Sequence, residues 1–360
     1  MARYHSGAGR AVVAAGDKGA MSNLTHSRQT PSDAGVPSYV LLYESGELER
    51  RGRVLLERLE SCDICPRACG VDRFRDRLGF CASPRRPLIA SACAHRGEEP
   101  PISGQRGSGT IFLANCNLRC VFCQNHQISQ ESEAFTSQPG SAEVLADIML
   151  GLQDEHRCHN INLVSPTHFV PQIVEALCLA VPRGLRLPLV YNTNAYDSVD
   201  TLRLLDGVVD IYLPDIKYSS NRVGGQLSGA DGYVEVARAA IAEMYRQVGP
   251  DLVLNDDGTV ARGLIVRHLV LPGGLAGSDD SLTWLARSVS TSVTLSIMAQ
   301  YYPAHRALDM AVLSRRVGRQ EYRAVVEKAQ ELGFEHIWAQ EPEAHGHYRP
   351  DFSRKGHPFE

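Results

Sequence analysis

The sequence contains no long apolar run, since no stretch approaches the roughly 20 residues that a membrane-spanning helix needs. It also has no surplus of positive charge, because 37 Lys and Arg residues stand against 41 Asp and Glu residues, for a net charge of −4. These absences argue against a membrane protein and give no electrostatic reason to expect nucleic-acid binding. The first residues lack the apolar core of a secretory signal, so we expect a cytoplasmic protein.

The first 35 residues are rich in Gly, Ala, Ser and Thr and show little apolar periodicity. Their composition predicts a disordered tail over residues 1–35, or an over-long start ahead of Met21. A transit peptide is the alternative, because basic residues outnumber acidic ones there. The charged residues within the first 30 positions are Arg3, Arg10, Asp17, Lys18 and Arg28.

Ten cysteines are many for a chain of this kind, and most of them fall into two groups. The first group is Cys62, Cys65, Cys69 and Cys81, and the second is Cys116, Cys120 and Cys123. In a chain without a secretory signal, such short spacings predict metal ligation before disulfides. Of the others, Cys93 could replace one ligand of the first group, whereas Cys158 and Cys178 are expected to be buried apolar residues in helical segments.

The remaining pattern predicts an α/β fold. A helix is expected over residues 47–60, followed by a loop-rich segment over 62–81. Strands are expected over residues 110–115, 160–165, 187–194, 208–217, 262–272 and 292–301, with a last one in "FEHIWAQE". Helices between them are expected over residues 142–156, 170–181, 198–205, 233–248, 281–289 and 320–333. Asn255 to Gly258 form a turn signal that suggests a small hairpin.

Repeated β–α units with nearly continuous apolar strands imply a parallel sheet that is covered on both sides. The number of units favours a partial (β/α)6 TIM-like barrel with an N-terminal Cys-rich extension, and an open Rossmann-type sheet is the alternative. The expected parts are the tail at 1–35, the helix and metal-binding extension at 36–103, the barrel at 104–345 and a C-terminal tail at 346–360.

The second cysteine group has the spacing C-x3-C-x2-C and directly follows the first barrel strand. Three thiolates on one loop can hold three irons of a four-iron cluster, while a complete set is four cysteines. The fourth iron would then be open to a chelating ligand. The alternative is a zinc knuckle completed by His126 or another cysteine.

This arrangement, with Phe122 just before the last cysteine, resembles the radical S-adenosylmethionine (SAM) superfamily. The resemblance is closest to its pyruvate formate-lyase activating enzyme-like branch. It rests on stretches such as "CDICPRACGVDR", "HRGEEPPISGQRGSGTIF", "CNLRCVFCQNHQIS", "NLVSPTHFVPQI", "YLPDIKY" and "SIMAQYYPAH". It implies a [4Fe–4S] cluster on Cys116, Cys120 and Cys123 whose open iron chelates SAM, with Phe122 near the adenine.

The resemblance further implies the activity and the partners. One electron would cleave SAM to methionine and a 5′-deoxyadenosyl radical, which then abstracts hydrogen from an unidentified substrate. Activation of a glycyl-radical enzyme is one form of this oxidoreductase chemistry. The implied partners are a reductant such as flavodoxin or ferredoxin and a small-molecule, peptide or protein substrate, with neither nucleic acid nor membrane.

Polar residues end the later strands, and strand ends of a parallel barrel converge on one mouth. They are Thr167, His168, Asn192, Asn194, Asp215, Lys217 and Arg267, all candidate SAM- or substrate-binding residues. The superfamily's usual Gly-Gly-Glu is replaced here by Thr167 and His168. His168 is a SAM contact, a substrate acid/base or a structural imidazole. Asp215 and Lys217 could instead be a buried structural pair, and Arg267 suits the SAM carboxylate.

The first cysteine group supplies four thiols, enough for a closed zinc site or a second [4Fe–4S] cluster. Two other functions are kept open. A non-catalytic iron–sulfur or zinc scaffold, or an electron-transfer protein, would bind no SAM. A radical SAM methyltransferase would produce S-adenosylhomocysteine, although no added cobalamin-binding domain is evident.

Overall fold

A computed structural model describes residues 36–133, 140–340, 350–353 and 357–359 of the chain. The predicted tail at 1–35 therefore lies outside the described residues. Residues 37–360 form one unit by their internal contacts.

The described strands form one mostly parallel sheet in the order β1-β2-β3-β4-β5-β7-β8-β9. All pairs from β2 onward along this order are parallel, whereas β1 is antiparallel to β2. The strands are β1 (Ile89–His95), β2 (Ser108–Leu113), β3 (Ile161–Val164), β4 (Leu189–Thr193), β5 (Ile211–Pro214), β7 (Val260–Leu269), β8 (Thr294–Met298) and β9 (Ile337–Ala339). The expected α/β fold is confirmed, and the sheet is an open, partial barrel because β1 and β9 end the pairing order.

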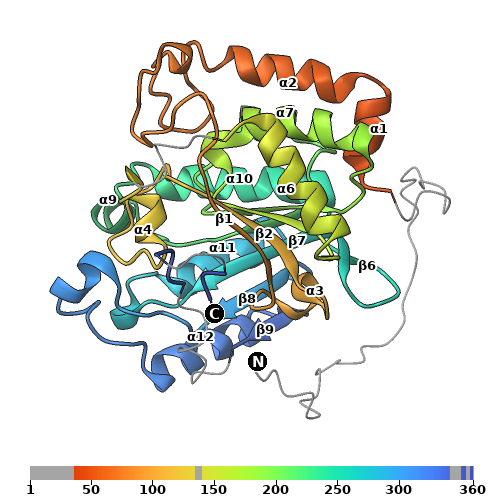
Figure 1. Cartoon of the computed structure of the whole chain (residues 1–360). Helices are drawn as coiled ribbons and strands as arrows, with labels where there is room; N and C mark the ends of the chain where they lie inside the picture. Colours follow the sequence, from red (N-terminus) through yellow and green to blue (C-terminus); the bar gives the residue numbers. More distant parts are fainter. Residues whose placement is uncertain (1–35, 134–139, 341–349, 354–356, 360) are drawn as a thin grey trace. The chain divides into compact units, whose positions relative to one another are not determined.

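Helices cover this sheet and follow the predicted periodicity closely. They are α1 (Ser38–Glu44), α2 (Glu47–Glu57), α3 (Pro100–Ser103), α4 (His126–Ser129), α6 (Ala142–Asp154), α7 (Val170–Ala180), α8 (Val199–Leu204), α9 (Asn221–Ser228), α10 (Tyr233–Val248), α11 (Ser278–Ser288) and α12 (Arg319–Glu331). Helix α2 packs along α7, which attaches the N-terminal extension to the barrel (Figure 1). None of the described helices is long and apolar enough to cross a membrane.

Five elements were not predicted from the sequence: strand β1 and the helices α1, α3, α4 and α9. Strand β1 lies inside the expected extension and pairs with the first barrel strand, so the extension contributes to the sheet. Helices α3 and α9 also went unnoticed, although α9 later proves to hold the second cysteine group. The predicted hairpin is confirmed, because β6 (Val253–Leu254) pairs antiparallel with β7 around the turn at 255–258.

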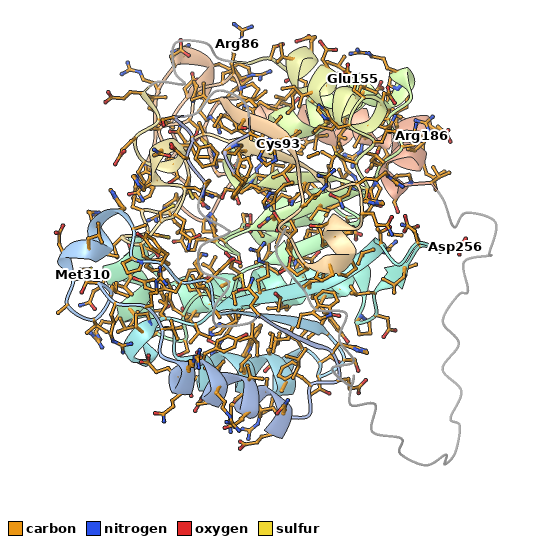
Figure 2. All side chains as sticks on the ribbon, turned by 60° about the horizontal axis from the view of Figure 1, so that its bottom comes forward. Arg86, Cys93, Glu155, Arg186, Asp256 and Met310 are labelled. Carbon is orange, nitrogen blue, oxygen red and sulfur yellow. The ribbon has the colours of Figure 1, made fainter. Side chains whose placement is uncertain are left out.

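Cys93 lies on β1 and packs in a buried cluster with Phe112 and Ile128. Figure 2 shows it on this strand, whereas Arg86 and Arg186 project from the surface. On the outer side, the ring of Phe352 contacts that of Phe112 at a centroid distance of 5.2 Å. The described C-terminal residues therefore cover part of β1 and β2.

Three glycines before and at the start of β2 are required by geometry. Gly104 and Gly107 have φ of +50° and +96°, in the left-handed region that favours glycine. Gly109 has no such φ, but a Cβ there would lie 2.7 Å from the carbonyl oxygen of Asn160. Close approach of two backbones therefore sets the identity of Gly109.

This difference can be tested with two Gly→Ala variants. Gly109→Ala should lower the free energy of unfolding by about 1–3 kcal/mol, because the added methyl group overpacks a rigid neighbour. Gly151→Ala, in α6, meets nothing within 4 Å and should be neutral or stabilise by up to about 1 kcal/mol. Chemical denaturation measures both values, and equal effects would contradict the packing at Gly109.

Candidate functional site

The second cysteine group lies on the loop after β2, at the carboxyl edge of the parallel strands. The residues within two positions of the ends of β2, β3 and β4 lie at this edge. Asn115, Ser165 and Ala195 there have φ of +71°, +53° and +60°, an uncommon conformation for residues other than glycine. Such backbone strain clusters at functional sites, which marks this edge as a candidate.

Helix α9 holds the cysteine loop in place. The amides of Arg119 and Val121 donate to the carbonyl oxygens of Ser228 and Leu227, at 2.9 and 2.8 Å. The Ser228 hydroxyl also donates to the Cys120 sulfur at 3.0 Å. The loop conformation is thus fixed by backbone contacts that need no metal.

Polar groups surround the other two sulfur atoms as well. The Asn194 amide donates to Cys116 Sγ at 3.5 Å, and the Ser129 hydroxyl lies 3.2 Å from Cys123 Sγ. Burial, and after it the Cys120 thiol, raises the pKa of Cys116 to about 11 and that of Cys123 to about 12. Metal binding would therefore have to displace protons from buried thiols.

The spacing of the sulfur atoms bears on which metal fits. Among the described residues, one group of three His, Cys, Asp or Glu side chains has its ligand atoms all within 4.8 Å of one another. This group is His126, Glu131 and His305, and it contains no cysteine. At least one pair among the three sulfurs of this loop is therefore more than 4.8 Å apart, whereas Zn–S bonds of ~2.3 Å in a tetrahedral zinc site put the sulfurs ~3.8 Å apart. The donor set and its spacing fit an iron–sulfur cluster.

His126, which the zinc-knuckle alternative named, contacts Glu131 and His305. Its Nδ1 lies 3.2 Å from a Glu131 oxygen, and its ring stacks on that of His305 at 4.9 Å. The three side chains are partly or fully exposed. Sequence reasoning named only His126 of this group, since His305 is far away along the chain.

A buried charged cluster lies inside the sheet beside the cysteine loop. Lys217 Nζ donates to Asp215 Oδ2 at 2.6 Å, and the Arg267 guanidinium lies 3.6 Å from Asp215 Oδ1. Burial alone would lower the pKa of Lys217, but the Asp215 carboxylate and then the Cys120 thiol outweigh it and raise the pKa. Lys217 thus carries positive charge within electrostatic reach of the cysteine sulfurs.

Two glutamates that sequence reasoning did not single out belong to the same cluster. Arg267 Nη1 lies 3.4 Å from Glu98, and Arg267 Nε lies 3.6 Å from Glu99. Ser296 donates to Glu99 at 2.8 Å, and burial raises the pKa of Glu98. Their signal in the sequence is the "GEEPP" run, in which Pro100 opens α3 directly after the two carboxylates.

The structure brings most of the predicted strand-end residues together. Asn192 accepts from Arg267 at 3.4 Å, and Asn194 donates to Asn117 Oδ1 at 2.9 Å as well as to Cys116. Phe122 is buried and meets Tyr301 edge-on at 5.9 Å. Arg267 already faces carboxylates of its own chain, so its role in binding the SAM carboxylate stays a prediction.

Thr167 and His168 point elsewhere. The Thr167 hydroxyl donates to Asp197 at 2.7 Å, in a buried network that Tyr191 and Thr193 complete. His168 Nε2 lies 2.9 Å from the Ala114 carbonyl oxygen, and burial lowers the pKa of its imidazole to about 3. These contacts favour the structural imidazole among the three alternatives for His168.

The first cysteine group also converges in space, although it is not on the barrel. Its four sulfur-bearing residues, Cys62, Cys65, Cys69 and Cys81, line one cavity together with Arg73 and His168. Cys93 does not line this cavity, so it is not an alternative ligand. Cys158 is buried as expected but follows α6, whereas Cys178 lies in α7 and is half-buried.

The structural reading of the Asp215–Lys217 pair gives a stability prediction. Asp215→Asn should lower the free energy of unfolding by about 3 kcal/mol, because it leaves buried cations short of a counter-charge. The matched change Asp200→Asn removes an exposed pair with Arg203, at 77% and 64% side-chain exposure, and should cost less than about 1 kcal/mol. If denaturation gives the same small loss for both, Asp215 is free for another role.

Comparison with known proteins gives relatives but no family. No protein-family model matches the chain. It is 29% identical over 286 residues to an uncharacterized protein of Methanocaldococcus jannaschii, MJ0674, covering 78% of this chain and 77% of that protein.

Two solved structures are distantly similar. A radical SAM methyltransferase from Sphaerobacter thermophilus gives a TM-score of 0.42 at 11% identity, covering 64% of this chain and 66% of that one, just under two thirds. TYW1 with a lysine-pyruvate adduct bound gives a TM-score of 0.39 at 11% identity, covering 62% and 73%. Likenesses of this size assign no activity to the chain.

Proposed function

We propose that the chain is a radical SAM enzyme whose Cys116, Cys120 and Cys123 hold a [4Fe–4S] cluster. The observation that carries the proposal is the loop itself, with three sulfurs at more than single-ion spacing at the carboxyl edge of a parallel sheet. Three cysteines can bind three of the four irons, which leaves the fourth iron open to SAM. When bound, the cluster and SAM supply a 5′-deoxyadenosyl radical by one-electron cleavage of SAM, and this radical takes hydrogen from a substrate.

The chain's own residues prepare the site for this chemistry. Asn194 and Ser228 donate hydrogen bonds to Cys116 and Cys120, which favours the thiolate forms that bind iron. The Lys217 ammonium adds positive charge beside the same sulfurs. Together they offset part of the cost of burying an anionic cluster.

SAM carries an ammonium and a carboxylate group, so its site needs both signs of charge. The buried cluster of Asp215, Lys217 and Arg267, with Glu98 and Glu99 behind it, offers both within the sheet. Phe122 and Tyr301 add an apolar wall beside the loop. A site of this kind keeps water away from a reactive radical.

The partners follow from the same proposal. A one-electron reductant of the flavodoxin or ferredoxin class must deliver the electron, and the substrate must offer a hydrogen atom at the barrel mouth. The glycyl-radical activase role stays a prediction from the sequence resemblance, as does a peptide or protein substrate.

Reductive SAM cleavage is the direct test. Protein purified without oxygen and supplied with iron, sulfide, SAM and dithionite should form 5′-deoxyadenosine, measured by mass spectrometry. Cys116→Ala, Cys120→Ala and Cys123→Ala combined should abolish the product, because no iron can then be presented to SAM. Cys178→Ala, a half-buried cysteine in α7, is the matched control and should keep the wild-type yield.

Two outcomes would contradict the proposed hydrogen-abstracting enzyme. If fully iron-loaded wild-type protein neither binds SAM nor forms 5′-deoxyadenosine, the chain is a metal-binding scaffold or electron carrier instead. S-adenosylhomocysteine as the main product would identify a methyltransferase.

A further inference from the structure

We propose that Cys62, Cys65, Cys69 and Cys81 hold a second centre, and that this centre is a four-iron cluster and not a zinc ion. The four side chains line one cavity, and no disulfide joins any of them. The segment's backbone closes around it, since Cys62 N donates to Val71 O and Gly70 N to Cys62 O, both at 2.9 Å. Hydrogen bonds of the segment's own backbone thus help to gather the thiols.

The spacing of the four sulfurs argues against a single ion. No three of them lie within 4.8 Å of one another, because among the described residues the only such group is His126, Glu131 and His305. Four sulfurs at ~2.3 Å from one zinc ion would lie ~3.8 Å apart. A cubane, whose irons and sulfides separate its cysteine ligands, fits the wider spacing.

The charges around the cavity call for an anion inside it. Arg73 lines the cavity and is 1% exposed, and its guanidinium is always charged. Its two Nη groups donate to the carbonyl oxygens of His168 and Pro84, whereas its Nε has no hydrogen-bond partner. The guanidinium also lies over the Phe169 ring, 5.5 Å from its centroid. A buried cation whose hydrogen bonds go to carbonyl oxygens is costly. A cluster held by four thiolates supplies the missing negative charge and an acceptor.

Two more features of the lining suit metal-bound sulfur. The Arg67 amide donates to Cys65, and the Phe80 amide donates to Cys69 Sγ at 3.4 Å. His168 lines the same cavity, and its Nδ1 has no partner.

The second centre would adjoin the three-cysteine loop. Arg67 Nε and Nη2 donate to Asn117 O at 3.1 Å, and Arg119 Nη2 donates to Phe80 O at 2.7 Å. Both guanidinium groups lie over the Phe80 ring, that of Arg67 at 3.6 Å and that of Arg119 at 5.0 Å from its centroid. The Phe80 side chain is 38% exposed, so the contact between the two cysteine-bearing loops lies at the protein surface.

The test counts metal in the variant that cannot hold the first cluster. The Cys116/Cys120/Cys123→Ala variant, purified without oxygen and reconstituted, should keep about four irons and four sulfides per chain, and wild type about eight. After dithionite reduction the variant should show the electron paramagnetic resonance signal of a reduced four-iron cluster, unchanged by SAM. Cys65→Ala with Cys81→Ala should lose about half of the wild-type iron, and Cys178→Ala none.

One zinc per chain in the triple variant, or no metal at all, would overturn the proposal. This result does not depend on the double variant, which could lose its fold, and circular dichroism checks that separately. Arg73→Leu should lower the iron content of the triple variant, whereas Arg75→Leu, at an exposed neighbour, should not. The iron count is independent of SAM cleavage, so the failure of the proposed enzyme activity would leave it standing.

Discussion

The parallel register of β2, β3, β4 and β5 is the constraint on which the candidate site depends. Because these strands run the same way and pair in sequence order, the loops that follow them meet at one edge. The cysteine loop after β2, Asn194 after β4 and Asp215 after β5 are therefore neighbours despite about 100 residues of separation. Helix α9 and the charged cluster of Asp215, Lys217 and Arg267 then hold these residues in place.

The chain collects sulfur and charge in the same region. Two groups of thiols lie close to buried charged residues. Lys217 and Arg267 are paired with Asp215, Glu98 and Glu99, whereas the hydrogen bonds of the buried Arg73 go to carbonyl oxygens, which is costly for a cation. Anionic iron–sulfur clusters on both loops would offset that cost. The polar and strained features at this edge are thus explained together by metal binding, and are hard to explain by stability alone.

The elements of the fold could largely be predicted, because each barrel unit has an apolar strand and an amphipathic helix of ordinary length. Strand β1 could not, since "IASACAH" is short and weakly apolar, and its pairing with β2 is set by tertiary contact. Helix α9 was missed because its two glycines, Gly224 and Gly225, weaken the helical signal.

The residues of the candidate site could likewise be predicted only in part. The cysteines of both groups could be predicted from spacing alone, because short loops force their thiols together. Glu98 and Glu99 could not, because no local sequence pattern shows that they contact Arg267, which is distant in the sequence. Side-chain direction was equally hidden for Thr167 and His168, whose backbone turns away in a short 3-10 helix after β3. Strand-end position predicts proximity to a site but not orientation within it.

The central claim is that the Cys116 loop presents an open iron to SAM. The most direct measurement is diffraction at the iron edge from crystals grown without oxygen in the presence of SAM. We predict a four-iron centre on Cys116, Cys120 and Cys123, with the amino and carboxylate groups of SAM on its fourth iron. A single zinc ion there, or a cluster whose fourth iron is held by a protein side chain with SAM absent, would contradict this account.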